Sequence, residues 1–201
     1  MAGVISVRLP DGSQRELAEG TTAGEFAQLI GPRLAKAAVV ANVDGHQVDL
    51  SSALVDGSEV AIVTADSEAG REVLRHSTAH VMAQAVLRLW PGAKYAIGPV
   101  IENGFYYDFA LPGGAHFSDD DLGRIETEMR AIIAEDQPFV RHEHGLGEGL
   151  ALFADQPFKR EIIEAVESGA NEVDAGGSVV STYWNSDSFT DLCRGPHVPS
   201  T

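Results

Sequence analysis

Short apolar runs separated by turn-forming residues fill the first 64 residues. This alternation constrains the fold more than any other feature of the sequence. Residues 4–9 alternate apolar and polar side chains, as a half-buried strand does. Residues 10–13 read Pro-Asp-Gly-Ser, a tight-turn sequence that predicts a second short strand after it. Thr22 followed by Glu25 predicts a capped helix, which Gly31-Pro32 is expected to end.

Two further runs, residues 39–43 and 47–50, flank Asp44-Gly45 and predict a hairpin. A last strand is expected at residues 59–63. The order strand, strand, helix, strand, strand, strand is that of a β-grasp, ubiquitin-like domain, which we place at residues 1–64. Because catalytic sites need clustered His, Cys or paired carboxylates, we expect a binding or spacer module without chemistry.

A short polar linker at residues 65–70 is predicted to lead into a larger α+β domain, residues 65–201. A long helix is expected at residues 72–90, ended by Pro91-Gly92. A second helix, with Ser118 as its cap, is predicted to run from residue 119 to about 135. The remaining predictions are short helices at 148–154 and 157–167 and a mainly antiparallel sheet from strands at 94–97, 105–109, 178–184 and 188–192.

Composition excludes several classes of protein. The 201 residues suffice for two small domains with cores of their own, and no run of about 18 apolar residues predicts a membrane span. The first 20 residues lack a secretory signal, and the single cysteine, Cys193, excludes an internal disulfide, so a cytoplasmic location is expected. The net charge of −16 argues against a chain that grips nucleic acid tightly by itself.

Two pairs of potential ligands stand out in the second domain. His76 and His80 are four residues apart, so a helix presents them on one face. Cys193 and His197 bracket a Gly-Pro bend that can turn both side chains toward one point. Three His and one Cys can hold zinc tetrahedrally, and they can equally bind a water and an ester without metal. The plainer alternative is that they are packing and surface residues.

Three other side chains are candidates for chemistry. Asp191 precedes Cys193 by two positions on an expected strand, so a carboxylate there can orient a histidine or a water. Lys159 is followed by an acidic stretch, 161–191, without Lys or Arg, and it can bind a phosphate or polarise a carbonyl. Tyr107 can donate its phenol to a substrate. A solvated aspartate, a helix-surface lysine and a packed tyrosine are the alternatives.

The other histidines are expected to be inert. His142 and His144 share a strand face without Cys or a further His nearby, which predicts a solvated strand rather than a metal site. His46 is placed in a turn and His116 in a loop.

Three segments resemble the N-terminal region of bacterial-type threonyl-tRNA synthetases. They read RHSTAH at 75–80, AIGPVIENGFYYD at 96–108 and DLCRGPHVP at 191–199. The resemblance covers essentially the whole chain, and it identifies residues 1–64 as a TGS domain and residues 65–201 as an editing domain. The ATP-dependent ligase core, with its Mg and zinc, has no counterpart here, so we expect a fragment or a stand-alone editing protein.

The resemblance implies an aminoacyl-tRNA ester hydrolase, a proofreading deacylase that cleaves seryl-tRNA(Thr) and spares threonyl-tRNA. No cofactor is expected, although zinc remains an option on the His/Cys set. The partners implied are the tRNA(Thr) acceptor end carrying serine and the remainder of the synthetase, with no membrane. The family's site residues fall on His76, His80, Lys159, Asp191, Tyr107, Cys193 and His197. Phe158 departs from the family's frequent tyrosine, which makes the assignment of the lysine the weakest.

Roles within that site follow as hypotheses. His76 and His80, or Asp191, would position the attacking water. His197 and Lys159 would contact the terminal adenosine or the carbonyl, and Tyr107 and Cys193 would shape the serine pocket. Two other readings stay open: a non-catalytic tRNA-binding or regulatory module, and a zinc-dependent deacylase of the alanyl-tRNA type. Residues 71–101 carry four basic residues and one acidic residue. This count predicts that the entrance to the site is locally basic and that tRNA binding is weak and salt-sensitive.

Overall fold

The computed structural model describes residues 3–167 and 178–201, which form two compact units. One unit holds residues 1–77 together with 195–199, and the other holds residues 78–194 together with 200–201. The long helix continues through the boundary between the two units at residues 77 and 78.

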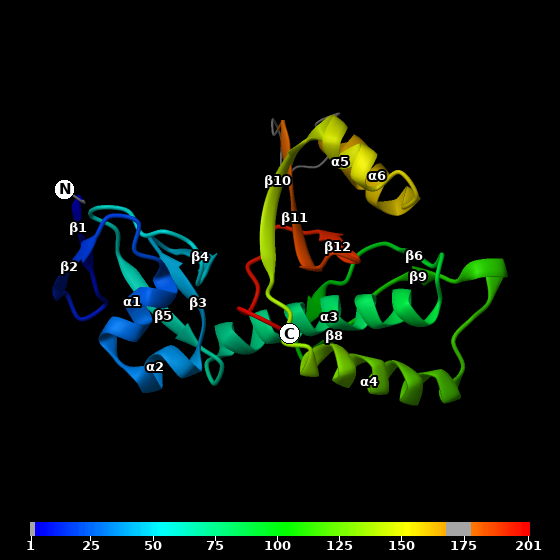
Figure 1. Ribbon diagram of the computed structural model, residues 1–201, viewed down its shortest axis with the longest axis horizontal. Helices are drawn as coiled ribbons and strands as arrows, with labels where there is room; N and C mark the ends of the chain where they lie inside the picture. The colour runs from blue at the N-terminus through cyan, green and yellow to red at the C-terminus, as the bar shows by residue number, and fades with distance from the viewer. Residues whose placement is uncertain (1–2, 168–177) are drawn as a thin grey trace. The chain divides into compact units, whose positions relative to one another are not determined.

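The first unit is the predicted β-grasp domain (Figure 1). Its strand β3 lies between β4 and β5, antiparallel to both, while β1 pairs antiparallel with β2. A parallel bridge between Arg8 and Glu59 joins β1 to the start of β5. The elements are β1 (Val4–Arg8), β2 (Gln14–Ala18), α1 (Ala23–Ile30), α2 (Pro32–Ala37), β3 (Ala38–Val43), β4 (His46–Asp49) and β5 (Val60–Thr64).

Helix α1 begins where its cap predicts. The Thr22 hydroxyl accepts from the backbone N–H of Glu25, and the Glu25 carboxylate accepts from the backbone N–H of Thr22. Gly31-Pro32 ends α1 but also starts the short helix α2, which was not predicted. Proline at the first position of a helix needs no N–H donor there, so the same dipeptide serves as a stop and as a start.

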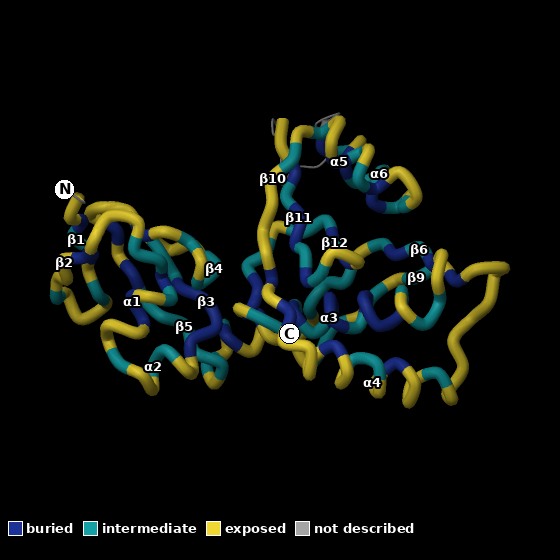
Figure 2. The backbone as a smooth tube through the Cα atoms, viewed as in Figure 1, coloured by how far each residue is buried: buried dark blue, intermediate teal, exposed yellow. Residues whose placement is uncertain are grey.

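The core of this unit lies between α1 and the strands. Phe26 of α1 joins Val7 of β1 and Val60 of β5 in one buried cluster. Ile5, Leu17, Ala23, Ala41 and Leu54 complete the buried set. Figure 2 marks buried stretches in dark blue, among them most of β3. The alternating burial along β1 is the pattern that the sequence predicts for a half-buried strand.

The second unit is α+β with antiparallel strand pairs, also as predicted (Figure 1). Its main sheet has the order β10-β11-β12. Helix α3 begins in the first unit and continues into the second. The elements are α3 (Glu68–Leu89), β6 (Lys94–Tyr95), β7 (Val100–Ile101), β8 (Gly104–Phe105), β9 (Phe109–Ala110), the 3-10 helix η1 (Pro112–Gly114), α4 (Asp119–Ala134), β10 (Val140–Gly145), α5 (Leu146–Leu152), α6 (Pro157–Glu167), β11 (Val179–Ser186) and β12 (Phe189–Leu192).

The predicted strands at 94–97 and 105–109 are much shorter in the structure. They break into β6 paired with β9 and β7 paired with β8, each two residues long. Gly98-Pro99 interrupts the ladders, because proline lacks the N–H donor that a ladder needs, and Glu102-Asn103 forms the turn between β7 and β8. The backbone from residue 96 to residue 108 is consequently made of short paired segments and turns. Ala96 and Tyr107 in this stretch contact Lys159 on the buried face of α6.

Helix α6 positions the site. It packs against α5, and Ile163 of α6 joins Phe153, Tyr95 and Val180 in a buried cluster. The apolar stripe of α6 faces that cluster, and Lys159 lies one turn before Ile163 on the same face. No helix in residues 3–167 and 178–201 is long and apolar enough to span a membrane.

Candidate functional site

Lys159 is the most deeply buried charged side chain among the described residues, with 1% of its surface exposed. Its ammonium lies 2.5 Å from a carboxylate oxygen of Asp191 and donates to the Tyr107 hydroxyl over 3.1 Å. A third contact is made to the backbone oxygen of Ala96. A buried ammonium without such partners would be severely destabilising, so the three contacts explain how helix α6 tolerates a lysine in its core face.

Asp191 lies on β12 and gathers the other side chains of this network. One of its oxygens accepts from the Tyr107 hydroxyl over 2.5 Å, and the same oxygen lies 3.6 Å from Nε2 of His80. His80 itself is 3% exposed, and its ring meets Phe139 and Phe189 edge-on. His80, Tyr107 and Lys159, all candidates from the sequence, thus lie around one buried carboxylate, that of Asp191.

Two tyrosines frame the ammonium. The Lys159 nitrogen lies 4.7 Å from the ring centre of Tyr95 and 5.5 Å from that of Tyr107, a cation–π arrangement. Burial, and next the charge of Asp191, raises the pKa of Tyr95, and the same two causes raise the pKa of Tyr107 well above its ordinary value. Both phenols therefore remain protonated hydrogen-bond donors throughout the physiological range.

The second histidine pair is organised by its own contacts. The rings of His76 and His197 lie 4.3 Å apart, centre to centre. Oγ of Ser77 lies 3.0 Å from Nδ1 of His197 and accepts from the N–H of Val198 over 3.1 Å. The N–H of His197 donates to Asp49 over 2.9 Å. These contacts fix the bend that follows β12 and the orientation of a histidine that is 1% exposed.

The four predicted metal ligands are divided between the two units. His76 and His197 lie in the first unit with their rings 4.3 Å apart, and His80 and Cys193 lie in the second unit. Imidazole nitrogens and a thiolate are the donors that zinc prefers in proteins, so this His/Cys set suits the ion chemically.

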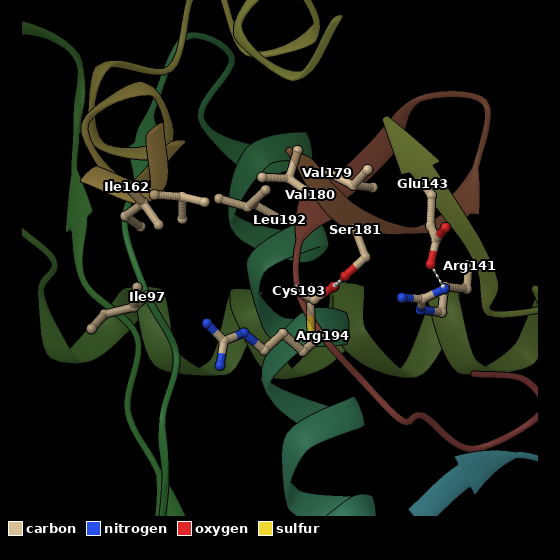
Figure 3. A pocket seen from close by; sticks show the side chains of 11 residues that line it. Ile97, Arg141, Glu143, Ile162, Val179, Val180, Ser181, Leu192, Cys193 and Arg194 are labelled. Carbon is tan, nitrogen blue, oxygen red and sulfur yellow. Dashed lines mark hydrogen bonds and ion pairs between the residues drawn. The ribbon is translucent and has the colours of Figure 1, made fainter. Parts of the chain in front are cut away.

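Cys193 also lines an open pocket of about 510 Å³ (Figure 3). Ile162, Val180 and Leu192 form an apolar part of its wall, and Arg194 projects beside the thiol. The backbone oxygen of Cys193 accepts from the Ser181 hydroxyl over 2.7 Å, which ties the segment after β12 to β11. Lys159, Asp191 and Tyr107 do not line this pocket, so the buried network and the pocket are separate features of the same unit.

Sequence reasoning missed several residues that organise the site. Tyr95 and Ala96 were read as an ordinary strand, and Ser77 and Asp49 carried no signal at all. Ser77 is adjacent to His76, but neighbours in a helix do not share a face, so the spacing rule that found the histidines could not find it. Only the fold brings Asp49 to the His197 backbone.

The stretch predicted to be locally basic is largely neutralised. Arg71 and Arg75 both pair with Glu68, at 2.7 Å and 3.4 Å. Arg88 pairs with Glu135 at 2.8 Å, and the hydrogen bonds that its guanidinium donates to that carboxylate raise the pKa of the arginine. The count of basic residues along the sequence therefore overstates the positive charge available to a polyanion.

Comparison with known proteins shows which proteins this chain resembles. Residues 5–64 match the TGS domain family. Proteins named threonine–tRNA ligase are 47% identical over 198 residues in Rubrobacter xylanophilus, 49% over 197 in Acidithiobacillus ferrooxidans and 46% over 201 in Symbiobacterium thermophilum. These alignments cover 98%, 97% and 100% of this chain but 29%, 29% and 30% of the relatives.

The fold and these matches define the chain as a TGS domain joined to an α+β unit, and the two parts together are similar to proteins named threonine–tRNA ligase. More particularly, the chain is similar over its whole length to the N-terminal region of bacterial threonyl-tRNA synthetases. It spans about 30% of the length of the relatives it matches.

Proposed function

We propose that this chain is a proofreading hydrolase that cleaves the ester of seryl-tRNA(Thr) and spares threonyl-tRNA. The observation that carries the proposal is the buried ion pair of Lys159 and Asp191 beside His80. A neutral core would serve stability as well as a buried ion pair, so its presence next to a histidine favours a functional role. The similarity to threonine–tRNA ligases supplies the substrate class.

The physical need for such an activity is clear. Serine lacks one methyl group of threonine, and a missing methylene is worth only about 1–3 kcal/mol of binding discrimination. A synthetic site built for threonine therefore admits serine. A second site too small for the extra methyl can accept serine alone and hydrolyse its ester, and that sieve separates the two amino acids.

In the proposed reaction a water attacks the ester carbonyl carbon. The bond from that carbon to the ribose oxygen breaks, and the ribose oxygen takes up a proton to leave as a hydroxyl. His76 and His80 position the water, and Asp191 fixes the His80 ring from one side. Tyr107 and Cys193 shape the space for the serine side chain, and His197 contacts the terminal adenosine.

Lys159 takes a positioning role in this scheme. Its ammonium donates to the Ala96 backbone oxygen and to the Tyr107 hydroxyl and makes an ion pair with Asp191, so these three groups surround it. It therefore acts through Asp191 and Tyr107 rather than on the carbonyl oxygen directly.

The test is deacylation of purified seryl-tRNA(Thr) and threonyl-tRNA(Thr) by this chain and by Asp191→Asn. The amide keeps the size of the side chain but removes the charge that holds Lys159 and His80, so we expect a loss of at least about 10²-fold in seryl-tRNA hydrolysis. Threonyl-tRNA should be spared by both proteins. Absence of turnover by the unaltered chain would overturn the proposal and leave a tRNA-binding module.

A zinc-dependent deacylase of the alanyl-tRNA type is a second candidate, favoured by the donor chemistry of His76, His80, Cys193 and His197 and by the closeness of the His76 and His197 rings. Those four side chains would hold the ion, and zinc would supply an acidified water and a Lewis acid for the carbonyl. Metal analysis of protein purified without chelators, together with hydrolysis of alanyl-tRNA, separates the two. One zinc per chain with alanyl-tRNA turnover would favour this candidate.

A further inference from the structure

The pocket beside Cys193 combines an aliphatic wall with one projecting cation (Figure 3). The aliphatic side chains that line it are Ile97, Ile162, Val166, Val179, Val180 and Leu192. The guanidinium of Arg194 lies below Ile162 and Leu192 in this view and reaches toward Ile97. The volume of about 510 Å³ far exceeds what a serine side chain needs, so the pocket has room for the part of a substrate that adjoins a seryl ester.

The strand pattern explains why the cation lies against this wall. Leu192 pairs with Thr182, so Val180, two positions before Thr182 on β11, projects on the same side of the sheet as Leu192. Arg194 follows Leu192 by two positions, and Figure 3 shows its side chain on that side as well. Cys193 lies between the two, so one short segment presents a thiol and a guanidinium in different directions.

The charged residues of the pocket leave an excess of positive charge. Arg141 pairs with Glu143 at 2.7 Å on β10, so these two lining residues offset each other. Arg194 adds a further positive charge, which gives the described lining residues a net charge of +1. The whole chain has a net charge of −16. A local excess of positive charge on an acidic protein favours an anion at this place.

A guanidinium against aliphatic side chains suits a phosphodiester. Its N–H donors match the spacing of two phosphate oxygens, and neighbouring apolar groups strengthen the attraction because they limit the access of water. The same wall can cover the apolar faces of the adjoining sugar and base. Aliphatic side chains offer no donor or acceptor to a base edge, so this part of the pocket is expected to recognise the backbone without reading the sequence.

We propose that Arg194 binds a backbone phosphate of the unpaired 3′ end of the tRNA and so holds the seryl ester beside Cys193. This inference rests on the proposed function, because the aminoacyl ester is attached to that end of the RNA. The contact contributes to binding rather than to the chemical step, since the phosphate lies away from the ester carbonyl. It also supplies a cation that α3 does not, because Arg71 and Arg75 pair with Glu68.

Alkylation of the single cysteine gives a binding assay that does not depend on hydrolysis. Iodoacetamide modifies one thiol in this chain, that of Cys193, and intact mass follows the rate. We expect the RNA trinucleotide CCA to slow this reaction with saturation. Arg194→Gln should raise the half-saturating concentration by about tenfold or more, and Arg194→Lys should restore part of the loss, because a charged hydrogen bond is removed and then partly replaced.

The matched control is Arg33→Gln, which removes the same charge at an exposed arginine outside the pocket. It should be protected like the unaltered chain. A trinucleotide with uncharged methylphosphonate linkages should protect the unaltered chain about as weakly as CCA protects Arg194→Gln. With seryl-tRNA as substrate, Arg194→Gln should raise KM while kcat stays within about twofold, and the slope of log kcat/KM against log salt should become shallower by about 0.7, the value for one single-strand phosphate.

The proposal is overturned if CCA does not protect Cys193, or if Arg194→Gln is protected as well as Arg33→Gln. Inorganic phosphate compared with chloride at equal ionic strength separates the two sources of the anion. Protection by inorganic phosphate equal to that by CCA would assign the pocket to a free anion and would also overturn the proposal. Protection by CCA that depends on Arg194, in a chain that does not hydrolyse seryl-tRNA, would support this contact and overturn only the proposed function.

Discussion

At the scale of single residues, Gly98 shows how closely the site is packed. A Cβ atom at this position would meet the ring of Tyr107 at 2.2 Å, which real side chains never approach. Tyr107 donates to Asp191 and accepts from Lys159, so its ring cannot shift without disturbing both. The glycine is therefore a steric requirement of the buried network, and no spacing rule applied to the sequence identifies it.

Gly98→Ala should displace Tyr107 and lower seryl-tRNA hydrolysis by about 10²-fold, because small misplacements of site groups have effects of that size. The free energy of unfolding should fall by about 1–3 kcal/mol through overpacking. Gly104→Ala is the control, since a Cβ there meets nothing within 4 Å. Equal hydrolysis by the two variants would show that Tyr107 is not held in place by this contact.

The raised pKa of Tyr95 predicts that the folded protein loses stability at alkaline pH. Burial and the charge of Asp191 raise its folded-state pKa above the ordinary 10.0, so the folded chain keeps this proton when the unfolded chain has lost it. The stabilisation is fully present below about pH 10 and is lost above it, at about 1.4 kcal/mol per pH unit for one phenol. Tyr95→Phe should reduce the slope of unfolding free energy against pH between 10 and 11, measured by urea titration. An unchanged slope would contradict the assignment.

Sequence patterns identify candidate site residues where the chemistry depends on local spacing. His76 and His80 were found because a helix places positions four apart on one face, and Cys193 and His197 because a Gly-Pro bend separates them. The role of Tyr95 was not found, since burial against Lys159 depends on α6 folding back over β6. The site could thus be predicted as a set of polar residues but not as a network with a buried cation at its centre.

At the scale of elements, helix α5 offers a matched pair of glycines. Gly149 faces β11, where a Cβ would meet Val180 at 2.8 Å and Ile163 at 3.4 Å. Gly147 lies on the open side of the same helix, and a Cβ there meets nothing within 4 Å. The helix therefore needs glycine at one position for close approach to the sheet, and tolerates it at the other.

Alanine should act with opposite signs at these positions. Gly147→Ala should raise the free energy of unfolding by up to about 1 kcal/mol, since alanine favours the helix over glycine. Gly149→Ala should lower it by about 1–3 kcal/mol, because α5 must move away from β11. Chemical denaturation of both variants measures this directly. The same sign at both positions would mean that α5 does not pack as closely as the structure shows.

Helices and strands were predictable where the cap and turn residues agree with the hydrophobic periodicity. Helix α6 begins at Pro157, as predicted, and the structure describes it as far as Glu167, while α4 begins after its Ser118 cap. The strands between residues 94 and 110 were predicted too long, since apolar runs extend beyond the few residues that pair. Pairing depends on a partner strand distant in sequence, and a single run does not reveal where that partner ends.

At the scale of the whole molecule, the net charge of −16 and the pairing of the arginines in α3 bear on tRNA binding. Phosphate contacts need free Lys and Arg, and each contact adds about 0.9 to the slope of log K against log salt. With Arg71 and Arg75 paired to Glu68, we expect weak binding of uncharged tRNA by this chain and a shallow salt slope. The remainder of a full-length synthetase would then supply most of the affinity.

Glu68→Gln tests this expectation because it releases both arginines at once. Glu16→Gln, on the exposed strand β2, is the control with the same change in charge. If the arginines of α3 are available once freed, Glu68→Gln should bind tRNA more tightly than Glu16→Gln at low salt and should show a steeper salt dependence. Filter binding across a salt series measures both quantities. Identical behaviour of the two variants would mean that only net charge matters, and a nanomolar dissociation constant for the unaltered chain at physiological salt would contradict the weak binding inferred from its charge.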